Sequence, residues 1–209
     1  MTPEQVKYVQ DSDLGNNGIV FYEKLKSFRN AKMVDLGVRH GISSYIMLRD
    51  SLQNDNYVTG VDLVNCVHQS VYNHPRYKLI LGDSVKTGKE WTGGEIDVLF
   101  VDTLHTKEQV LNELEVWMPH VKDNGLVIFH DTHWPKNKFE NWKGRNWERP
   151  EEAVKAFFNV GDDLTADNEF FTMTAYPESW GMVFIQLKKK SKDFGKNVDW
   201  NEIHKFLTL

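Results

Sequence analysis

The sequence predicts an α/β protein with a doubly wound, mostly parallel seven-stranded sheet that ends in a C-terminal antiparallel hairpin. Five short apolar runs alternate with amphipathic helical segments, an order typical of a parallel sheet with helices on both faces. Two further β-rich runs near the C-terminus are separated only by residues 177–180, which predicts a hairpin. The expected strands are residues 33–36, 57–62, 77–81, 96–102, 126–131, 169–176 and 181–187.

Length and composition limit the class of protein. The chain has 209 residues, of which 40% are apolar, so we expect a single domain over residues 1–209. The net charge of −5 gives no general attraction to nucleic acid or anionic membrane, and neither is expected as a partner. Cys66 is the only cysteine, which excludes an intramolecular disulfide. No signal segment and no run of membrane-spanning length is present, which predicts a cytoplasmic protein.

Residues 1–30 are expected to form an N-terminal helical cap. The segment Thr2-Pro3-Glu4-Gln5 has the capping-box pattern that predicts a short helix to about residue 9. Residues 11–18 are polar and are expected to be a loop, whereas residues 19–28 have the apolar face of an amphipathic helix. We expect this cap to pack beside the central strand rather than to cover a substrate.

The first predicted strand is followed by a turn that has the features of a ligand site. Gly37 and Gly41 have no Cβ, so the backbone there can adopt positive φ and approach a bound molecule closely. Ser43 lies where the next helix, beginning near residue 42, offers free N–H groups. Asp35 precedes the turn, and Asp62 ends the second strand, where a carboxylate can accept both hydroxyls of a ribose.

The order Asp35-Leu36-Gly37-x-x-x-Gly41 differs from the Gly-x-Gly-x-x-Gly of dinucleotide-binding folds, and it resembles motif I of the class I S-adenosylmethionine-dependent methyltransferases. The resemblance implies a Rossmann-like fold and S-adenosylmethionine as the cofactor. It places Asp35 and Gly37 near the methionine part, lets Gly41 bring the helix close to the cofactor, and assigns the ribose to Asp62. The same turn adds Arg39 and Ser43 to the expected cofactor contacts.

The third strand ends in Gly82-Asp83-Ser84. By the same resemblance, an acid at this place binds the adenine amino group, so Asp83 with Ser84 is expected at the adenine end of the cofactor. Asp and Ser are also favoured at helix N-caps, and both roles can hold together. A short helix over residues 63–72 is expected between the second and third strands.

Acidic side chains end the fourth and fifth predicted strands. Asp102 and Asp131 should converge, because neighbouring parallel strands lie about 4.8 Å apart and these two are joined by a helix over residues 108–121. Converging carboxylates repel each other unless a proton or a cation lies between them, and Mg²⁺ is the usual cation. His130 or His105 could complete the set, which would make Mn²⁺ or Fe²⁺ plausible. In a regular strand, His130 would point to the face opposite Asp131.

Two stretches around these acids resemble the macrocin and sugar O-methyltransferase group, which is related to cephalosporin hydroxylase-like proteins. They are Phe100-Val101-Asp102-x-x-His105 and the run over residues 127–132, and the resemblance covers most of the chain. It implies O-methylation of a hydroxyl on a sugar, a glycoside or another small natural product. Several metal-dependent relatives have acids where this chain has Leu104 and His130.

These side chains also predict roles at the reacting centre. A divalent metal, with Mg²⁺ as the first choice, would be held by Asp102, Asp131 and His130. Either His105 or His133 would take the proton of the substrate hydroxyl, and Asp102 would contribute to the catalytic, metal and cofactor sites alike.

The region after the fifth strand is expected to be a substrate lid. Residues 132–150 contain three tryptophans and five basic residues without periodicity, and a loop this long is either functional or disordered. It begins where ligands bind in open α/β sheets, and exposed indoles suit sugar-like or aromatic substrates. Residues 189–209 are expected to form a C-terminal tail in which Asp199 caps a last helix. This helix would dock on the body or on a partner subunit, which makes a homo-oligomer a further expectation.

Three other functions fit parts of the sequence. An oxidoreductase on a similar fold would bind NAD, but Asp35, Asp83 and the C-terminal hairpin favour the methyltransferase interpretation. A non-catalytic cofactor-binding module would keep the turn and use Asp102 and Asp131 only for structure. A hydroxylase-like relative would share the fold but perform different chemistry.

Overall fold

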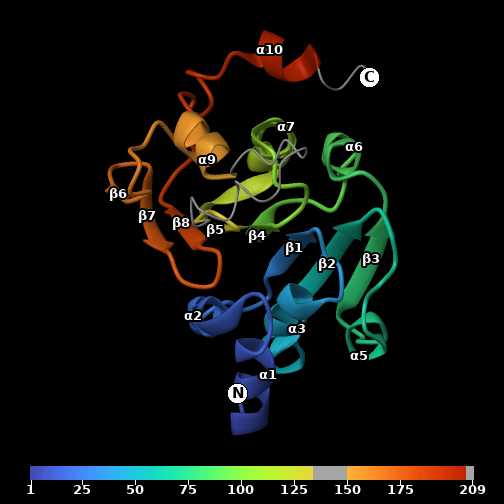
Figure 1. Cartoon of the computed structure of the whole chain (residues 1–209). Helices are drawn as coiled ribbons and strands as arrows, with labels where there is room; N and C mark the ends of the chain where they lie inside the picture. The colour runs from blue at the N-terminus through green and yellow to red at the C-terminus, as the bar shows by residue number, and fades with distance from the viewer. Residues whose placement is uncertain (134–149, 206–209) are drawn as a thin grey trace, which may run out of the picture.

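The computed structural model describes residues 1–133 and 150–205. Its centre is a single sheet with helices on both faces, and the strand order is β3-β2-β1-β4-β5-β8-β7-β6 (Figure 1). The predicted fold class is confirmed, with one difference in strand number. The sheet has eight strands instead of seven, because the two-residue strand β6 (Ala166–Asp167) pairs with β7 at the sheet edge. A pair this short has no periodic signal in the sequence.

Five strands form the parallel part of the sheet. Strand β1 lies between β2 and β4, so the order in which strands are added reverses at β1. Strands β2 and β3 lie on one side of it, and β4 and β5 lie on the other. In open α/β sheets, ligands bind at the carboxyl ends of the strands at such a reversal. The strands are β1 (Lys32–Leu36), β2 (Tyr57–Asp62), β3 (Tyr77–Leu81), β4 (Ile96–Val101) and β5 (Val121–His130).

The predicted antiparallel hairpin is present and extends the sheet from β5. It consists of β7 (Phe171–Tyr176) and β8 (Met182–Leu187), and β8 pairs antiparallel with β5. The turn between the two strands has three consecutive residues with positive φ, at Ser179, Trp180 and Gly181. This turn lies beside the carboxyl end of β5, because the backbone N–H of His133 donates to the carbonyl of Trp180.

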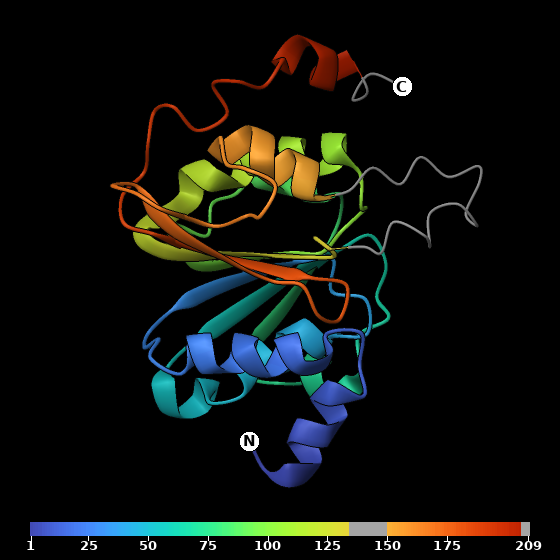
Figure 2. The same ribbon diagram turned by 60° about the vertical axis from the view of Figure 1, so that its left-hand side comes forward.

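Two layers of helices bury the faces of the sheet, as Figure 2 shows from the side. Alternate residues of β4 point into the two layers: Leu99 packs with Trp117 on one face, and Phe100 stacks on Phe21 on the other. The layer that contains the N-terminus has α1 (Pro3–Gln10), α2 (Gly15–Leu25), α3 (Ile42–Leu48), α4 (Ser51–Asn54) and α5 (Gln69–Tyr72). The other layer has α6 (Ser84–Lys89), α7 (Lys107–Trp117), the 3₁₀ helix η1 (Met118–His120) and α9 (Pro150–Phe158), with α10 (Trp200–His204) against α7.

Several element boundaries differ from the sequence prediction. Helix α2 begins at Gly15, inside the segment expected to be a loop, because the polar Asn17 is buried there by contacts to the hairpin turn. Helix α5 is only four residues long, since His68 caps it through Ser70 and the preceding residues are not helical. Strand β5 begins at Val121 and passes through the expected turn, with Asn124 at φ 62.

Other local predictions are confirmed. Thr2 and Gln5 form the capping box of α1, and Asp199 caps α10 by accepting from the N–H groups of Asn201 and Glu202. The expected lid, residues 132–150, lies outside the described residues except at its two ends. Within the described part of the chain, no helix is long and apolar enough to cross a membrane.

The contact between α2 and the hairpin turn gives a test of the N-terminal cap. Asn17 is buried and donates its side-chain amide to the carbonyls of Tyr176 and Glu178. Replacing Asn17→Ala removes both hydrogen bonds and should lower the free energy of unfolding by about 1–3 kcal/mol in urea denaturation. Asn16→Ala, which removes only two exposed hydrogen bonds, one to Glu178 and one from Gln10, is the matched control and should change stability by less than about 0.5 kcal/mol. Equal effects of the two substitutions would contradict the assigned contact.

Candidate active site

The turn between β1 and α3 has the backbone geometry that the sequence predicted. Gly37 and Gly41 adopt φ of 84° and 90°, which is the left-handed region that favours glycine. A Cβ on Gly37 would overlap the backbone carbonyl of Asp102 at the end of β4. The turn is fixed from β2 as well, because Asp62 accepts a 2.8 Å hydrogen bond from the N–H of Arg39.

Asp35 is placed differently from the cofactor contact that the resemblance implied. Its side chain is fully buried and accepts hydrogen bonds from Ser43, at 2.7 Å, and from Ser44. Burial raises the pKa of Asp35 to about 6, although the two serine hydroxyls oppose this effect. Asp35 and Ser43 therefore join the start of α3 to β1 in this structure, and the cofactor contact of Asp35 stays a prediction.

A cavity of about 360 Å³ opens at the carboxyl ends of β1 to β4, and we call it the turn cavity. It brings together most of the residues that were predicted to bind the cofactor. Its lining also contains residues that the sequence did not indicate, among them Leu63, Leu104 and Gln109. The predicted residues in the lining are Gly37, Arg39, Asp62, Asp83, Ser84 and Asp102.

Asp62 and Asp83, which both line the turn cavity, also accept hydrogen bonds from nearby backbone N–H groups. Asp62 accepts from the N–H groups of Arg39 and Val64, at 2.8 and 3.0 Å. Asp83 is the N-cap of α6 and accepts from the N–H of Lys86 at 2.8 Å. The N-cap interpretation of Asp83 is therefore correct, and the adenine contact stays a prediction.

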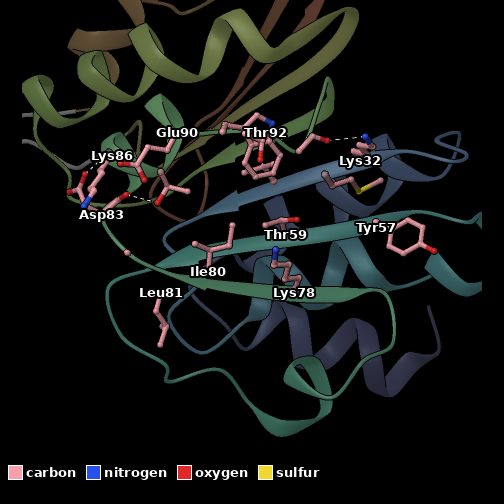
Figure 3. A pocket seen from close by; sticks show the side chains of 16 residues that line it. Lys32, Tyr57, Thr59, Lys78, Ile80, Leu81, Asp83, Lys86, Glu90 and Thr92 are labelled. Carbon is pink, nitrogen blue, oxygen red and sulfur yellow. Dashed lines mark hydrogen bonds between the residues drawn. The ribbon is translucent and has the colours of Figure 1, made fainter.

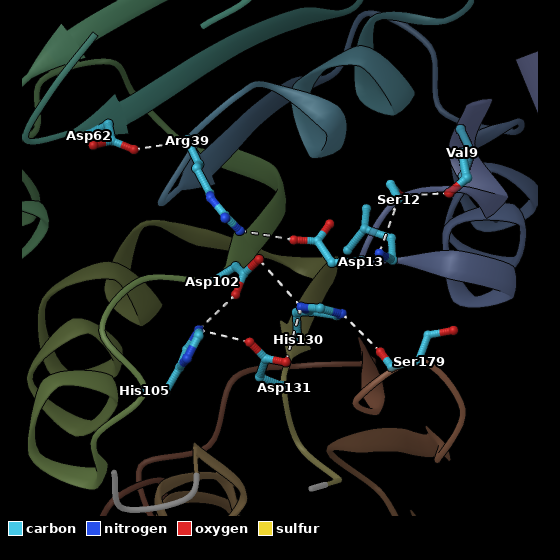
Figure 4. Close-up of polar contacts among 11 residues, drawn as sticks. Val9, Ser12, Asp13, Arg39, Asp62, Asp102, His105, His130, Asp131 and Ser179 are labelled. Atoms are coloured by element: carbon cyan, nitrogen blue, oxygen red, sulfur yellow. Dashed lines mark hydrogen bonds and ion pairs between the residues drawn. The ribbon is translucent and has the colours of Figure 1, made fainter. Parts of the chain in front are cut away.

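The strand-end acids converge on a histidine, as Figure 4 shows. His105 Nε2 lies 3.1 Å from Asp102 Oδ1 and 2.9 Å from Asp131 Oδ2. One ligand atom from each of these three side chains lies within 4.8 Å of the others, and we call them the acid–histidine cluster. Two carboxylates and one imidazole nitrogen form a donor set that fits a divalent cation.

Electrostatics dominate this cluster. Burial alone would favour neutral imidazole, but the two carboxylates outweigh it and raise the pKa of His105 to about 10. Burial also opposes a charge on His130, whereas Asp102 outweighs it and raises the pKa of His130 to about 9. In turn, burial would raise the pKa of Asp102, but His130 and His105 hold it well below the usual range. Positive charge is thus strongly favoured between the two acids.

His130 does not have the orientation expected of a regular strand. Strand β5 ends at His130, and Asp131 has φ 56, so the alternation of faces stops there. His130 Nδ1 consequently lies 3.4 Å from Asp102 Oδ2, while its Nε2 lies 3.2 Å from the carbonyl oxygen of Ser179. His105 completes the group that could hold a metal, and it lies closer to both acids than His130, whose Nδ1 is also 3.6 Å from Asp131 Oδ1.

His133 is separated from the acid–histidine cluster in the structure. It is exposed, and its backbone is paired with Trp180. It lines a different cavity, together with Glu151 and Lys155. The geometry therefore does not bring the second candidate base to the strand-end acids.

A second cavity, of about 370 Å³, lies directly over the cluster, and we call it the acid cavity. It is lined by Asp102, His105 and Asp131 on one side and by Asp13 and Leu14 of the N-terminal cap on the other. An ion pair of 3.2 Å joins Asp13 to Arg39 across its mouth (Figure 4). The N-terminal cap thus forms a wall of the site as well as packing on the sheet.

A further groove of about 540 Å³ runs along β1, β2 and β3, where Lys32 and Lys78 contribute to its lining (Figure 3). Thr59 and Lys78 line its floor, and Lys32 donates to the carbonyl of Gly93 at its rim. It meets the turn cavity only at Gly82 and Asp83, and it contains no residue of the acid–histidine cluster. We therefore place the chemistry in the turn and acid cavities.

The sequence analysis did not identify Glu113, a buried acid of α7 beneath the turn cavity. Glu113 accepts hydrogen bonds from Ser84, from Thr103 at 2.9 Å and from Gln109 at 2.8 Å. Its signal in the sequence is its spacing from Val110 and Trp117, three residues before it and four after it on the apolar face of the helix. A carboxylate on such a face must find hydrogen-bond donors.

Comparison with known proteins gives a partial match to one family. Residues 34–132 match a family model described as a methyltransferase domain, which is just under half of the chain. The matched segment runs from β1 to the end of β5 and includes the turn between β1 and α3 and both strand-end acids. With the sheet order, it confirms the resemblance to class I methyltransferases. Comparison with curated proteins gave no match.

Solved structures share this fold at low sequence identity. The SAH-bound methyltransferase PaMTH1 from Podospora anserina has a TM-score of 0.63 and 13% identity, covering 89% of this chain and 87% of its own. A candidate caffeoyl-CoA O-methyltransferase from Staphylococcus aureus has a TM-score of 0.58 and 14% identity, covering 82% of both chains.

A third similar structure comes from a longer protein. MycE from the mycinamycin biosynthetic pathway, in complex with Mg, SAH and mycinamycin VI, has a TM-score of 0.54 and 16% identity. The alignment covers 83% of this chain but 49% of MycE, so this chain spans about half the length of that protein. At these identities, the three likenesses show the fold.

The buried position of Glu113 gives a pH-dependent prediction. Burial raises the pKa of Glu113 to about 7 from 4.5, against the effect of its three hydrogen-bond donors. Because the folded protein disfavours the charged form, this group lowers stability as the pH rises from about 4.5 to about 7. The stability of Glu113→Gln relative to the unsubstituted protein should therefore be about 2 kcal/mol higher at pH 8 than at pH 5. Urea denaturation at both pH values measures this difference, and the control Glu108→Gln on the same helix should show none.

Proposed function

We propose that this protein is an S-adenosylmethionine-dependent methyltransferase that methylates a hydroxyl group of a small molecule such as a sugar, a glycoside or another natural product. The observation that carries the proposal is the junction of the two cavities. The turn cavity and the acid cavity share Gly37, Arg39 and Asp102 in their linings. A cofactor in the first cavity would therefore present its reactive end to the acid–histidine cluster in the second.

The residues of the turn cavity fit the cofactor in a definite direction. Asp62 offers carboxylate oxygens for the ribose, Asp83 and Ser84 lie at the adenine end, and Gly37 leaves room for the methionine part. When bound, S-adenosylmethionine supplies an electrophilic methyl group on sulfur. Asp35 and Ser43 contribute indirectly by fixing the start of α3.

The acid–histidine cluster fits a divalent metal, for which Mg²⁺ is our first choice. Asp102, His105 and Asp131 would hold it, because they already converge and a positive charge between the acids is favoured. A bound metal would orient the substrate oxygen and stabilise its developing negative charge. The MycE complex, which contains Mg and SAH, supports this choice by analogy.

The chain's own groups divide the remaining work. Asp13 and Leu14 of the N-terminal cap and Arg39 would enclose the substrate over the acid cavity. A single Nε2 cannot both ligate a cation and take a proton, so with His105 as a ligand the hydroxyl proton must pass to another acceptor. His133 stays a candidate base from the sequence alone, because the structure places it in a different cavity. His130, fixed by the Ser179 carbonyl, orients Asp102. The single-domain organisation, the lid, the C-terminal tail, the cytoplasmic location and a homo-oligomer stay predictions from the sequence.

Calorimetric titration with S-adenosylmethionine, SAH and NAD, each with Mg²⁺ and with a chelator, tests the proposed cofactor. We expect the two sulfur-containing nucleotides to bind and NAD not to bind, because the turn cavity has acids where a dinucleotide site needs a pyrophosphate-binding turn. Binding of NAD alone would favour an oxidoreductase. Binding of SAH without any methyl transfer to a broad panel of hydroxyl compounds would favour a non-catalytic module or a hydroxylase-like relative.

Substitution of Asp131→Asn tests the metal site separately from the cofactor. Loss of one carboxylate ligand should weaken Mn²⁺ or Mg²⁺ binding at least about tenfold, while SAH affinity changes less than about threefold. Titration of the metal into the SAH-bound protein measures both. Asp193→Asn is the control, because Asp193 is exposed and lies in the C-terminal segment. An unchanged metal affinity in Asp131→Asn would remove Asp131 from the ligand set.

A further inference from the structure

A hydrogen-bond network beneath the turn cavity fixes the side chain of Gln109. Its amide nitrogen donates to Glu113 Oε1 at 2.8 Å and to Ser84 Oγ at 3.0 Å. Ser84 in turn donates to Glu113, and Thr103 donates to the other carboxylate oxygen at 2.9 Å. All three donors, Ser84, Thr103 and Gln109, line the cavity, whereas Glu113 is buried behind them.

This network determines which end of the Gln109 amide is available to a ligand. An ionised carboxylate only accepts hydrogen bonds, so the NH₂ group of Gln109 must face Glu113. The carbonyl oxygen Oε1 is then turned away from Glu113. Protonation of Glu113 does not change this orientation, since the proton can lie on the oxygen facing Thr103, whose hydroxyl can accept it. Gln109 thus presents an acceptor, and no donor, to the cavity in both states.

The position of Gln109 corresponds to the base end of a nucleoside. In the proposed cofactor placement, with the ribose at Asp62, the base would extend toward Ser84 and Gln109, which line the same cavity. Two exposed leucines border this part of the cavity: Leu63 is 72% exposed and Leu104 is 60% exposed. Leucines this exposed would gain from covering the faces of a flat ring, which leaves the ring's edge to face Gln109.

We propose that Gln109, oriented by Glu113, is a specificity-determining residue that accepts a hydrogen bond from the exocyclic amino group of the purine, so that the site selects a 6-amino over a 6-oxo base. The inference rests on the proposed cofactor function. A 6-oxo purine places a second acceptor against Gln109 Oε1, and the two acceptors would then face each other without a proton between them. Glu113 is a positioning residue in this arrangement, because it acts through Gln109.

Asp83 is the competing acceptor at the same end of the cavity. Its Oδ1 already accepts the N–H of Lys86 as the N-cap of α6, and its side chain is exposed. Exposed acceptors discriminate weakly, because water replaces a lost partner at little cost. Asp83→Asn keeps an N-cap oxygen and so serves as the matched variant.

The experiment compares the binding of SAH with that of its 6-oxo analogue, S-inosylhomocysteine, by calorimetry. The unsubstituted protein should prefer SAH by at least about tenfold. Gln109→Met, of similar length but without an acceptor, should reduce this preference to about threefold or less. Glu113→Met should reduce it partly, because Gln109 is then free to rotate, whereas Glu113→Gln keeps an acceptor for Gln109 and should restore it. Asp83→Asn should retain the preference.

The outcomes separate this inference from the proposed function. Equal affinity of the unsubstituted protein for the two ligands, or a preference lost in Asp83→Asn and kept in Gln109→Met, overturns the role of Gln109 while the methyltransferase proposal stands. If neither ligand binds the folded protein, the proposed function fails and this inference fails with it. Circular dichroism and thermal unfolding of each variant show that the comparison is made on folded protein.

Discussion

The backbone contact between Gly37 and Asp102 is the constraint on which the rest of the site depends. Parallel pairing continues past the ends of β1 and β4, because the N–H of Asp102 donates to the carbonyl of Leu36 at 2.9 Å. The next residue, Gly37, turns at φ 84, and a side chain there would overlap the Asp102 carbonyl. The glycine turn and the first strand-end acid are therefore held against each other. This contact makes one residue, Asp102, part of both cavities.

From this junction, charge determines the organisation of the acid cavity. Asp102 and Asp131 are brought together by the register of β4 and β5, and like charges at this distance require a positive partner. The described structure provides that partner as His105, with His130 behind it. The same demand would be met by a divalent cation, which is why we connect the cluster to metal-assisted methyl transfer. The N-terminal cap then lines the acid cavity, and the hairpin turn holds His130 behind the cluster through the Ser179 carbonyl.

The sequence was sufficient for the features that depend on local pattern. Apolar runs located the five parallel strands and the hairpin, and the glycines located the turn, because strand burial and positive φ leave direct compositional signals. It was also sufficient to pair Asp102 with Asp131, since parallel neighbours end at the same edge of a sheet.

The remaining features depend on tertiary contacts. The choice of His105 over His130 follows from the positive φ of Asp131, a conformation that an aspartate adopts only in its context. The sequence predicts Asp35 as a cofactor ligand, whereas the structure buries its side chain against Ser43 and Ser44. Glu113 and Gln109 are ordinary helix residues in the sequence, and only the packing of α7 against α6 places Gln109 in the lining of a cavity and Glu113 behind it.

The most direct measurement is a crystal structure of the protein grown with SAH and Mn²⁺, with data collected at the manganese absorption edge. Our account predicts SAH in the turn cavity, with its ribose at Asp62 and its sulfur toward Asp102, and an anomalous peak bounded by Asp102, His105 and Asp131. SAH bound in that cavity with manganese absent or bound elsewhere would contradict the metal assignment. SAH bound outside the turn cavity would contradict the account as a whole.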